Sequence, residues 1–243
     1  MNITDPDFQL ERQLVLSNDE VHLWRIDLAA VAAREERWQK ILSSDERSRA
    51  TRFHFSRDRQ YFTATRALLR TILAGYLGSD PTKLIFRYSE KEKPSLEPGH
   101  SGRQVEFNVS HSGTMALLAF ARGRALGVDV EKIREDFDHE AIARRFFSDK
   151  ERRQLAALPA AARYEGFFRC WTRKESFIKA VGTGLSLPLH QFDVSLIPED
   201  KNALLATRPD AAEAALWSLQ EVPVGLGYVA ALCVKGQGWR LIT

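Results

Sequence analysis

The strongest constraint on the fold is an order of hydrophobic patterns that occurs twice along the chain. A strand pattern at Val21–Leu28 is followed by helical segments and then by further strands, starting with Val105–Ser110. The second half also starts helical, with Arg163–Val181 as its longest helix, and also ends in strands. Alternating apolar residues mark half-buried strands, whereas helices repeat with a period of about 3.6 residues. The sequence therefore predicts an α+β fold of two halves, 1–125 and 126–243.

Individual elements follow from the same patterns and from start and stop signals. Ser56 precedes a helix that runs through Leu77, and Gly78 follows it as a stop signal. A tight turn is predicted at His111–Gly113. The other predicted helices are Ala29–Leu42, Glu46–Arg52, His139–Phe147 and Asp149–Leu158; the other predicted strands are Leu84–Tyr88, Met115–Phe120, Leu126–Glu131, Phe192–Ile197, Trp217–Val222 and Tyr228–Val234; and Glu90–Gly102 and Pro198–Asp210 are predicted loops.

Short similarities between the halves have two interpretations. Thr65-Arg66 lies ten residues before Gly75, and Thr172-Arg173 lies ten residues before Gly182. Chance similarity between amphipathic segments would explain this spacing. A duplication would explain it too, and it would create a cleft between the halves, which is a favoured place for a ligand site.

Composition excludes several classes of protein. Of the 243 residues, 35 are Lys or Arg and 32 are Asp or Glu, and the resulting net charge of +3 is too small to indicate a nucleic-acid partner. The two cysteines, Cys170 and Cys233, lie in apolar runs, as expected of reduced thiols in a cytoplasmic protein. No apolar stretch approaches the roughly 20 residues of a membrane span. The N-terminal segment is polar and acidic, unlike a signal peptide.

The segment Gly127–Lys132 places two acids on one strand. Residues i and i+2 of a strand point to the same side, so Asp129 and Glu131 face one way while Val128 and Val130 face the core. A solvated acidic edge is one interpretation. The other is a cation site, because Mg²⁺ commonly binds through one or two carboxylates together with substrate phosphates.

The segment Trp171–Leu185 combines acid and base on a helix. Glu175 and Lys179 are neighbours at positions i and i+4, which is typical of an ordinary exposed ion pair. Trp171 and Ile178 lie near the same face, so a partly desolvated pair is the alternative. A desolvated Glu would serve as a metal ligand or a base, and a nearby Lys would hold a phosphate.

A third segment, Phe107–Gly113, ends in small polar residues around His111. In a strand, Phe107 and Val109 point inward, and Asn108 and Ser110 point the other way. Ser110, His111 and backbone N–H groups suit a phosphate-binding turn, although a single His at a turn is usually exposed or structural. Basic residues have the same two interpretations, as phosphate contacts or as a solvated face. They are the cluster of Arg47, Arg49 and Arg52, and Lys93 further along the chain.

Taken together and in this order, these segments resemble the Sfp-type 4′-phosphopantetheinyl transferases. The resemblance rests on Lys93-Pro94, Phe107–Gly113, Gly127–Lys132 and Trp171–Leu185, and it covers nearly the whole chain. It implies two pseudo-symmetric α+β halves with the active site in the cleft between them. The implied reaction moves the phosphopantetheine arm of coenzyme A onto a serine of a carrier protein and releases adenosine 3′,5′-bisphosphate.

The resemblance also implies the roles of individual residues in the reaction. Asp129, Glu131 and Glu175 would hold Mg²⁺, with Mn²⁺ as the alternative ion. Glu175 would also act as the catalytic base, directly or through water. Lys179 would contact the phosphates and offset charge on the leaving group.

Further residues correspond to positions that bind the phosphates of coenzyme A. They are Lys93, Ser110 and His111, together with Arg49 near the 3′-phosphate. Glu46 stands where some members carry a basic residue, so Arg47, Arg49 or Arg52 would supply that charge.

The expected partners are coenzyme A and an apo acyl or peptidyl carrier protein, with no nucleic acid and no membrane. The duplicated length argues for a monomer, since the small trimeric holo-acyl-carrier-protein synthases are about half as long. The alternative, from a different class of function, is a non-catalytic module that binds coenzyme A or a carrier protein. The complete set Asp129, Glu131 and Glu175 argues against it.

Overall fold

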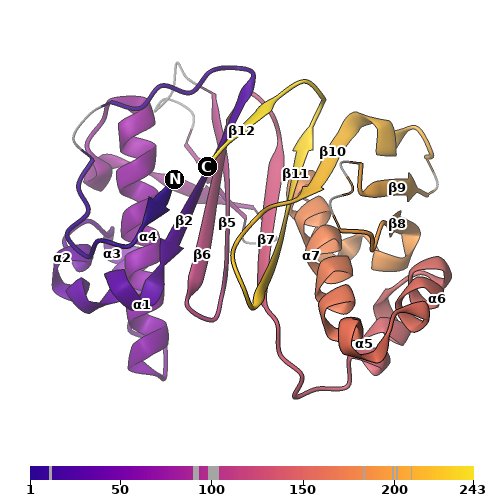
Figure 1. Ribbon diagram of the computed structural model, residues 1–243. Helices are drawn as coiled ribbons and strands as arrows, with labels where there is room; N and C mark the ends of the chain where they lie inside the picture. The colour runs from indigo at the N-terminus through magenta and orange to yellow at the C-terminus, as the bar shows by residue number, and fades with distance from the viewer. Residues whose placement is uncertain are drawn as a thin grey trace. The chain divides into compact units, whose positions relative to one another are not determined.

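The chain forms two compact units that each combine a β-sheet with helices (Figure 1), which confirms the predicted α+β class. The computed structural model describes residues 1–10, 13–89, 93–97, 104–182, 184–198, 200, 202–208 and 210–243. The first unit contains residues 1–106, 114–123 and 239–243, and the second contains residues 107–113 and 124–238. None of the helices within these ranges is both long and apolar enough to cross a membrane.

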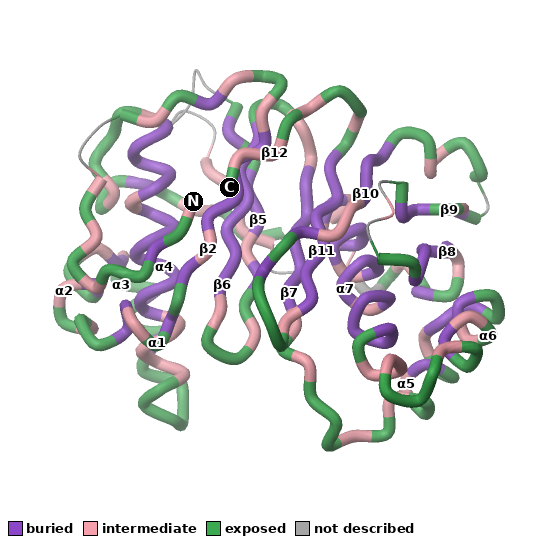
Figure 2. The backbone as a smooth tube through the Cα atoms, viewed as in Figure 1, coloured by how far each residue is buried: buried purple, intermediate pink, exposed green. Residues whose placement is uncertain are grey.

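The sheet of the first unit is organised around strand β2 (Glu20–Asp27). This strand pairs antiparallel with β6 (Met115–Arg122) and parallel with β1 (Asn2–Ile3) and β12 (Arg240–Ile242). β1 and β12 come from the two ends of the chain, and neither was among the predicted strands. Pairing on both sides buries most of β2, as the colours along the strand show in Figure 2.

The described residues of this unit also form four α-helices. They are α1 (Leu28–Val31), α2 (Glu35–Gln39), α3 (Ser44–Ala50) and α4 (Ser56–Leu77). The prediction of one helix over Ala29–Leu42 is wrong, because Arg34 leaves the helical region of backbone space at φ −98° and ψ 40°. Across this break, Trp38 Nε1 donates a hydrogen bond to Val31 O at 2.8 Å.

Helix α4 is the buried helix of the first unit, and it ends as predicted at Gly78. This glycine has a φ of +67°, which caps the helix in the left-handed conformation. Two residues earlier, Tyr76 ties the helix to β2: its hydroxyl accepts a hydrogen bond from Trp24 Nε1 at 3.1 Å and lies 2.8 Å from His22 Nδ1. Burial raises the pKa of Tyr76, so its hydroxyl stays protonated and available to these partners.

The second unit is a sheet covered by a long helix. The sheet runs β10 (Trp217–Glu221), β11 (Tyr228–Lys235) and β7 (Leu126–Lys132), all antiparallel. Helix α7 (Arg163–Val181) packs against β7 and β11. Two shorter helices, α5 (His139–Phe146) and α6 (Asp149–Ala157), pack against α7 and complete the unit (Figure 1).

Two loops predicted from the sequence contain strands. The predicted excursion Pro198–Asp210 includes β9 (Leu204–Thr207), which pairs antiparallel with β8 (Phe192–Val194), and Leu204 is buried among the core residues. In the first unit, β4 (Pro94–Leu96) pairs with β3 (Phe86–Tyr88) inside the predicted loop Glu90–Gly102. Residues 90–92 and 98–102 of that loop lie outside the described residues.

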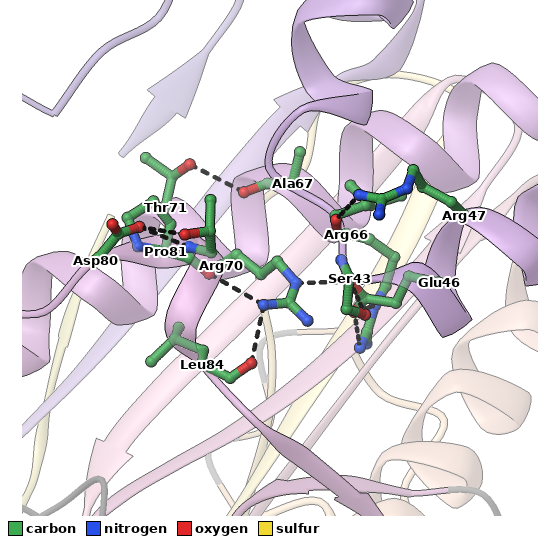
Figure 3. Close-up of polar contacts among 12 residues, drawn as sticks. Ser43, Glu46, Arg47, Arg66, Ala67, Arg70, Thr71, Asp80, Pro81 and Leu84 are labelled. Atoms are coloured by element: carbon green, nitrogen blue, oxygen red, sulfur yellow. Dashed lines mark hydrogen bonds and ion pairs between the residues drawn. The ribbon is translucent and has the colours of Figure 1, made fainter.

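A buried ion network joins α3 to α4 in the first unit (Figure 3). Glu46 is 2% exposed, and Arg66 contacts its Oε1 at 2.9 Å through Nε and at 2.5 Å through Nη2. Arg70 Nε donates to Glu46 Oε2 at 2.6 Å and reaches the carbonyls of Pro81 and Leu84 with Nη1. Burial raises the pKa of Glu46, but the two guanidiniums outweigh burial and lower it overall. Glu46 therefore has a structural role.

We predict that Glu46→Gln strongly destabilises the protein, because it leaves Arg66 and Arg70 buried without their counter-charge. Removing one partner of a buried pair costs about 3–5 kcal/mol, and urea unfolding at pH 7 should show a loss of this size. The lowered pKa means that Glu46 stabilises the fold fully above its unfolded pKa of about 4.3. This stabilisation is lost as the pH falls through the folded pKa, so the two proteins should converge in acid.

Glu36→Gln is the matched control, since Glu36 is exposed on α2. Its unfolding free energy should stay within about 0.5 kcal/mol of the wild type. Equal stability of the wild type and Glu46→Gln at pH 7 would contradict a structural role for the network.

Candidate active site

Strand β7 supplies two acids to the candidate site. Val128 and Val130 are fully buried in the core, while Asp129 and Glu131 point to the opposite side. Asp129 is 4% exposed, and Glu131 is partly buried. Both carboxylates accept hydrogen bonds from the same neighbouring strand, which confirms their common orientation. A solvated acidic edge does not fit this burial.

The neighbouring strand is β5 (Val105–Ser112), whose alternating polar side chains accept hydrogen bonds from backbone N–H groups of β7. We call this set the side-chain ladder. Its contacts are Asn108 Oδ1 with Val128 N at 2.9 Å, Ser110 Oγ with Val130 N at 3.3 Å, and Ser112 Oγ with Lys132 N at 3.1 Å. These contacts explain why residues 107–113 belong to the second unit, whereas the sequence placed them in a half that ends at residue 125. The strand also extends to Ser112, past the predicted start of the turn.

Lys179 meets Asp129 and Ser110 in a compact polar cluster. Ser110 Oγ donates to Asp129 Oδ1 at 2.8 Å, and Lys179 Nζ lies 2.6 Å from the same oxygen and 3.1 Å from Ser110 Oγ. The sequence paired Lys179 with Glu175; in the structure Lys179 forms its close ion pair with Asp129, and its charge also opposes the burial that raises the pKa of Glu175. Lys179 thus joins α7 to β7 as well.

Three carboxylates form one electrostatic group. Burial raises the pKa of Glu175, and the charges of Asp129 and Glu131 raise it further, while Lys179 opposes them. Burial likewise raises the pKa of Glu131, assisted by Asp129. Within the described residues, Asp129 Oδ2 is buried and has no hydrogen-bond partner. Mutual repulsion and an unused carboxylate oxygen both favour a cation at this place.

Gly127 allows α7 to lie directly on β7. A Cβ atom at this position would lie 2.2 Å from Ser176 O and 2.4 Å from Ala180 N, both backbone atoms of α7. Only glycine permits such an approach of helix to strand. The close packing places Lys179, on the same turn of α7, within reach of Asp129.

Lys174 precedes Glu175 in the sequence but points into the core and anchors the helix. Its Nζ donates to Leu189 O at 2.7 Å and Phe192 O at 2.8 Å, and it pairs with Glu151 Oε1 at 2.8 Å. Both side chains of this ion pair are fully buried. Glu151 in turn caps α6 by accepting from Ser148 N. These contacts fix the rotation of α7 about its axis, which sets the direction of Glu175.

The remaining residues predicted for the site lie in three places. His111 is exposed near the end of β5, next to Ser110. Arg49 and Arg52 are exposed in the first unit, where the Arg49 guanidinium lies 5.8 Å from the centre of the Phe62 ring. Lys93 also belongs to the first unit, and its backbone N–H donates to Ser89 Oγ at 3.1 Å.

Protein oxygens alone do not complete a metal site here. In the described part of the chain, no group of three or more His, Cys, Asp or Glu side chains is arranged so that it could hold a metal ion. A Mg²⁺ ion usually completes its coordination with waters and substrate phosphates and takes only one or two carboxylates from the protein. In this structure the three acids are therefore not arranged as a complete metal site, and a bound ion would need waters and substrate phosphates as further ligands.

Comparison with known proteins identifies the class. Residues 125–233 match the family described as the 4′-phosphopantetheinyl transferase superfamily, and residues 32–122 match the family described as the N-terminal part of 4′-phosphopantetheinyl transferases. The 4′-phosphopantetheinyl transferase HetI of Nostoc sp. is 40% identical over 93% of this chain and 92% of its own. The 4′-phosphopantetheinyl transferase Sfp of Bacillus subtilis is 31% identical over 82% of this chain and 84% of its own.

This chain therefore belongs to the 4′-phosphopantetheinyl transferase superfamily. The family inferred from the ordered motifs, and with it the prediction of a transferase, is confirmed. Sequence reasoning missed Asn108, Ser112 and Gly127, and it named Ser110 only as a phosphate ligand. Asn108, Ser110 and Ser112 recur at the period of a strand, but this signal was not interpreted as contacts to β7. Gly127 carried no local signal, since its role depends on where α7 packs.

We predict that Gly127→Ala separates α7 from β7. The added methyl meets rigid backbone, so overpacking should lower the free energy of unfolding by about 1–3 kcal/mol. The shift also moves Glu175 and Lys179 away from Asp129, and a misplacement of about 1 Å can cost about 100-fold in rate. Steady-state transfer kinetics and urea unfolding measure the two effects.

Gly166→Ala, in the first turn of α7, is the control. Its Cβ would meet chiefly the flexible side chain of Leu158, and Gly166 lies ten residues before Ser176, where α7 meets Gly127. Near-normal activity is expected for this variant. If Gly127→Ala were as active as Gly166→Ala, the close approach would not matter for the site.

Proposed function

We propose that this protein transfers the 4′-phosphopantetheine arm of coenzyme A to a serine of an apo acyl or peptidyl carrier protein, with adenosine 3′,5′-bisphosphate as the other product. The observation that carries the proposal is the convergence of three carboxylates and Lys179 from two distant sequence motifs on one cluster. Transfer of a phosphoryl group consists mostly of positioning and electrostatic stabilisation, and this cluster supplies both.

The carboxylates of Asp129, Glu131 and Glu175 would hold Mg²⁺, or Mn²⁺ in its place. The fit rests on the buried Asp129 Oδ2, which lacks a partner among the described residues, and on the repulsion between the three acids. When bound with coenzyme A, the ion would neutralise charge on the pyrophosphate. Metals of this kind prefer carboxylate and phosphate oxygens, which matches the donor set.

Glu175 is the proposed base. A serine hydroxyl is a weak nucleophile near neutral pH and needs a base within hydrogen-bond reach, either directly or through one water. The proton of the carrier serine passes to a Glu175 oxygen as Oγ attacks the phosphorus that carries the pantetheine arm. The bond from that phosphorus to the oxygen of the adenosine phosphate breaks. Burial raises the pKa of Glu175, which makes its carboxylate a stronger proton acceptor.

Lys179 offsets the charge that develops on the leaving phosphate. Its amino group lies at hydrogen-bond distance from Asp129 and Ser110, so it is held ready near the acidic cluster. We assign contacts with the phosphates of coenzyme A to Ser110 and His111 on β5, and to Lys93, Arg49 and Arg52 of the first unit. We propose further that the enzyme is a monomer and acts in the cytoplasm.

The direct test is to weigh the carrier. An apo carrier protein incubated with this protein, coenzyme A and Mg²⁺ should gain the mass of one phosphopantetheine arm, and adenosine 3′,5′-bisphosphate should appear in equal amount. With EDTA neither product should form, and added Mg²⁺ should restore both. Absence of any mass gain across fatty-acid, polyketide and nonribosomal-peptide carriers would refute the proposal. Full turnover in EDTA would refute the metal role alone.

We predict that Glu175→Gln lowers kcat by at least about 100-fold, the lower end of what a general base contributes. The amide keeps the size of the side chain but cannot accept the serine proton. Glu165→Gln is a control on the same helix, since Glu165 is half-exposed and pairs with Arg169. Circular dichroism should show that both variants keep the fold. Similar kcat values for the two variants would remove Glu175 as the base.

A further inference from the structure

Ser112 makes the same pair of contacts around Glu131 that Ser110 makes around Asp129. Its hydroxyl accepts from Lys132 N at 3.1 Å and donates to Glu131 Oε2 at 2.7 Å. We propose that Ser112 is a positioning residue, which holds the Glu131 carboxylate in the orientation needed to bind a divalent cation. The inference rests on the proposed function and concerns a residue to which neither the family resemblance nor the comparisons assign a role.

The two contacts of the hydroxyl reinforce each other. An O–H group that accepts a hydrogen bond becomes a better donor, because the chain of hydrogen bonds polarises it. The acceptor contact is to the backbone of β7, which is fixed by its pairing with β11. The donated bond therefore points from a rigid position, and it selects one arrangement of a side chain that would otherwise sample many rotamers.

The end of β5 is also held in place. Gly113 follows Ser112 with a φ of +57°, and a Cβ there would lie 2.7 Å from the Tyr228 hydroxyl and 3.0 Å from Lys132 Cδ. Gly113 therefore packs closely against the side chains of Tyr228 and Lys132, and this contact is possible because glycine has no side chain. Ser112 cannot move away from Glu131 without disturbing that packing.

The side-chain ladder has three positions, and they allow the contact with the β7 backbone to be separated from the contact with a carboxylate. Ser110 and Ser112 each bind a backbone N–H and a carboxylate. Asn108 binds the N–H of Val128 two residues earlier, where the position that corresponds to Asp129 and Glu131 is Gly127. The ladder thus offers one position that anchors β7 without orienting any acid.

Ser112 is the better position to test. Ser110 also contacts Lys179, so its replacement would disturb two charged groups at once. Ser112 is partly buried and lies in a strand, where β-branched residues are well accommodated. Thr and Val have nearly the same shape, so Ser112→Thr and Ser112→Val differ essentially by one hydroxyl.

The experiment measures Mn²⁺ binding by electron paramagnetic resonance, with coenzyme A present and no carrier protein. Loss of a residue that orients a metal ligand typically weakens metal binding by about 10-fold to 100-fold. We expect Ser112→Val to weaken Mn²⁺ binding by at least about 10-fold, and Ser112→Thr to stay within about twofold of the wild type. Asn108→Ala should lower the melting temperature but leave the Mn²⁺ affinity within about twofold.

Steady-state kinetics adds a second measurement. Ser112→Val should raise the Mg²⁺ concentration for half-maximal transfer, while kcat at saturating Mg²⁺ recovers most of the wild-type value. Equal Mn²⁺ affinity for the Thr and Val variants would overturn the role of Ser112 and leave the transferase proposal intact. An equally large loss in Asn108→Ala would also overturn it, since strand anchoring would then explain the effect. A wild-type protein that binds no Mn²⁺ would overturn the metal role and this inference together.

Discussion

Helix α7 lies so close to β7 that a single methyl group at Gly127 would meet Ser176 O at 2.2 Å. This close approach determines how the charged side chains of the second unit are arranged. It lets Lys179 reach Asp129 at 2.6 Å, and it brings Glu175 within the electrostatic influence of both acids of β7. The rotation of α7 is fixed from its other side by the buried pair of Lys174 and Glu151. A helix set one side-chain layer further away would keep the same residues but lose their interaction.

The orientation of the β7 acids is controlled by β5. A strand normally binds its neighbour through main-chain hydrogen bonds, but here the side chains of Asn108, Ser110 and Ser112 accept the N–H groups of β7. Such side-chain contacts need more space between two strands than direct main-chain hydrogen bonds do. Two of the three side chains, Ser110 and Ser112, also donate to a carboxylate. The same hydroxyls therefore satisfy the backbone and orient the acids. Short polar residues at alternate positions of β5 are explained by this double use.

Much of this could be predicted from the sequence, and the parts that could not share a cause. The long helices ending at Gly78 and Gly182, and the acids facing one side of β7, follow from local patterns and glycine signals. Strand β9 was missed because its four residues, Leu204–Thr207, depend on pairing with β8 for their conformation. The contact of Lys179 with Asp129 was missed because helical spacing reports neighbours within one helix and says nothing of a strand packed beside it. Spatial neighbours that are distant in sequence are thus the common source of error.

Hydrogen bonding and charge separate the structural acids from those of the site. Both oxygens of Glu46 have partners, and arginines lower its pKa. Burial raises the pKa of Glu151, while Lys174 and hydrogen bonds from the Val194 and Ser148 backbone oppose the effect. An unused oxygen alone is not decisive, because Asp193 Oδ1 is also buried without a partner within the described residues.

The pKa of Asp193 is nevertheless lowered, since Ser148 and Arg208 outweigh its burial. At Glu175, in contrast, two neighbouring carboxylates add to burial, and a single lysine opposes all of them. A fold gains no stability from acids that repel one another in a buried place, and this repulsion is the observation that supports the proposed cation.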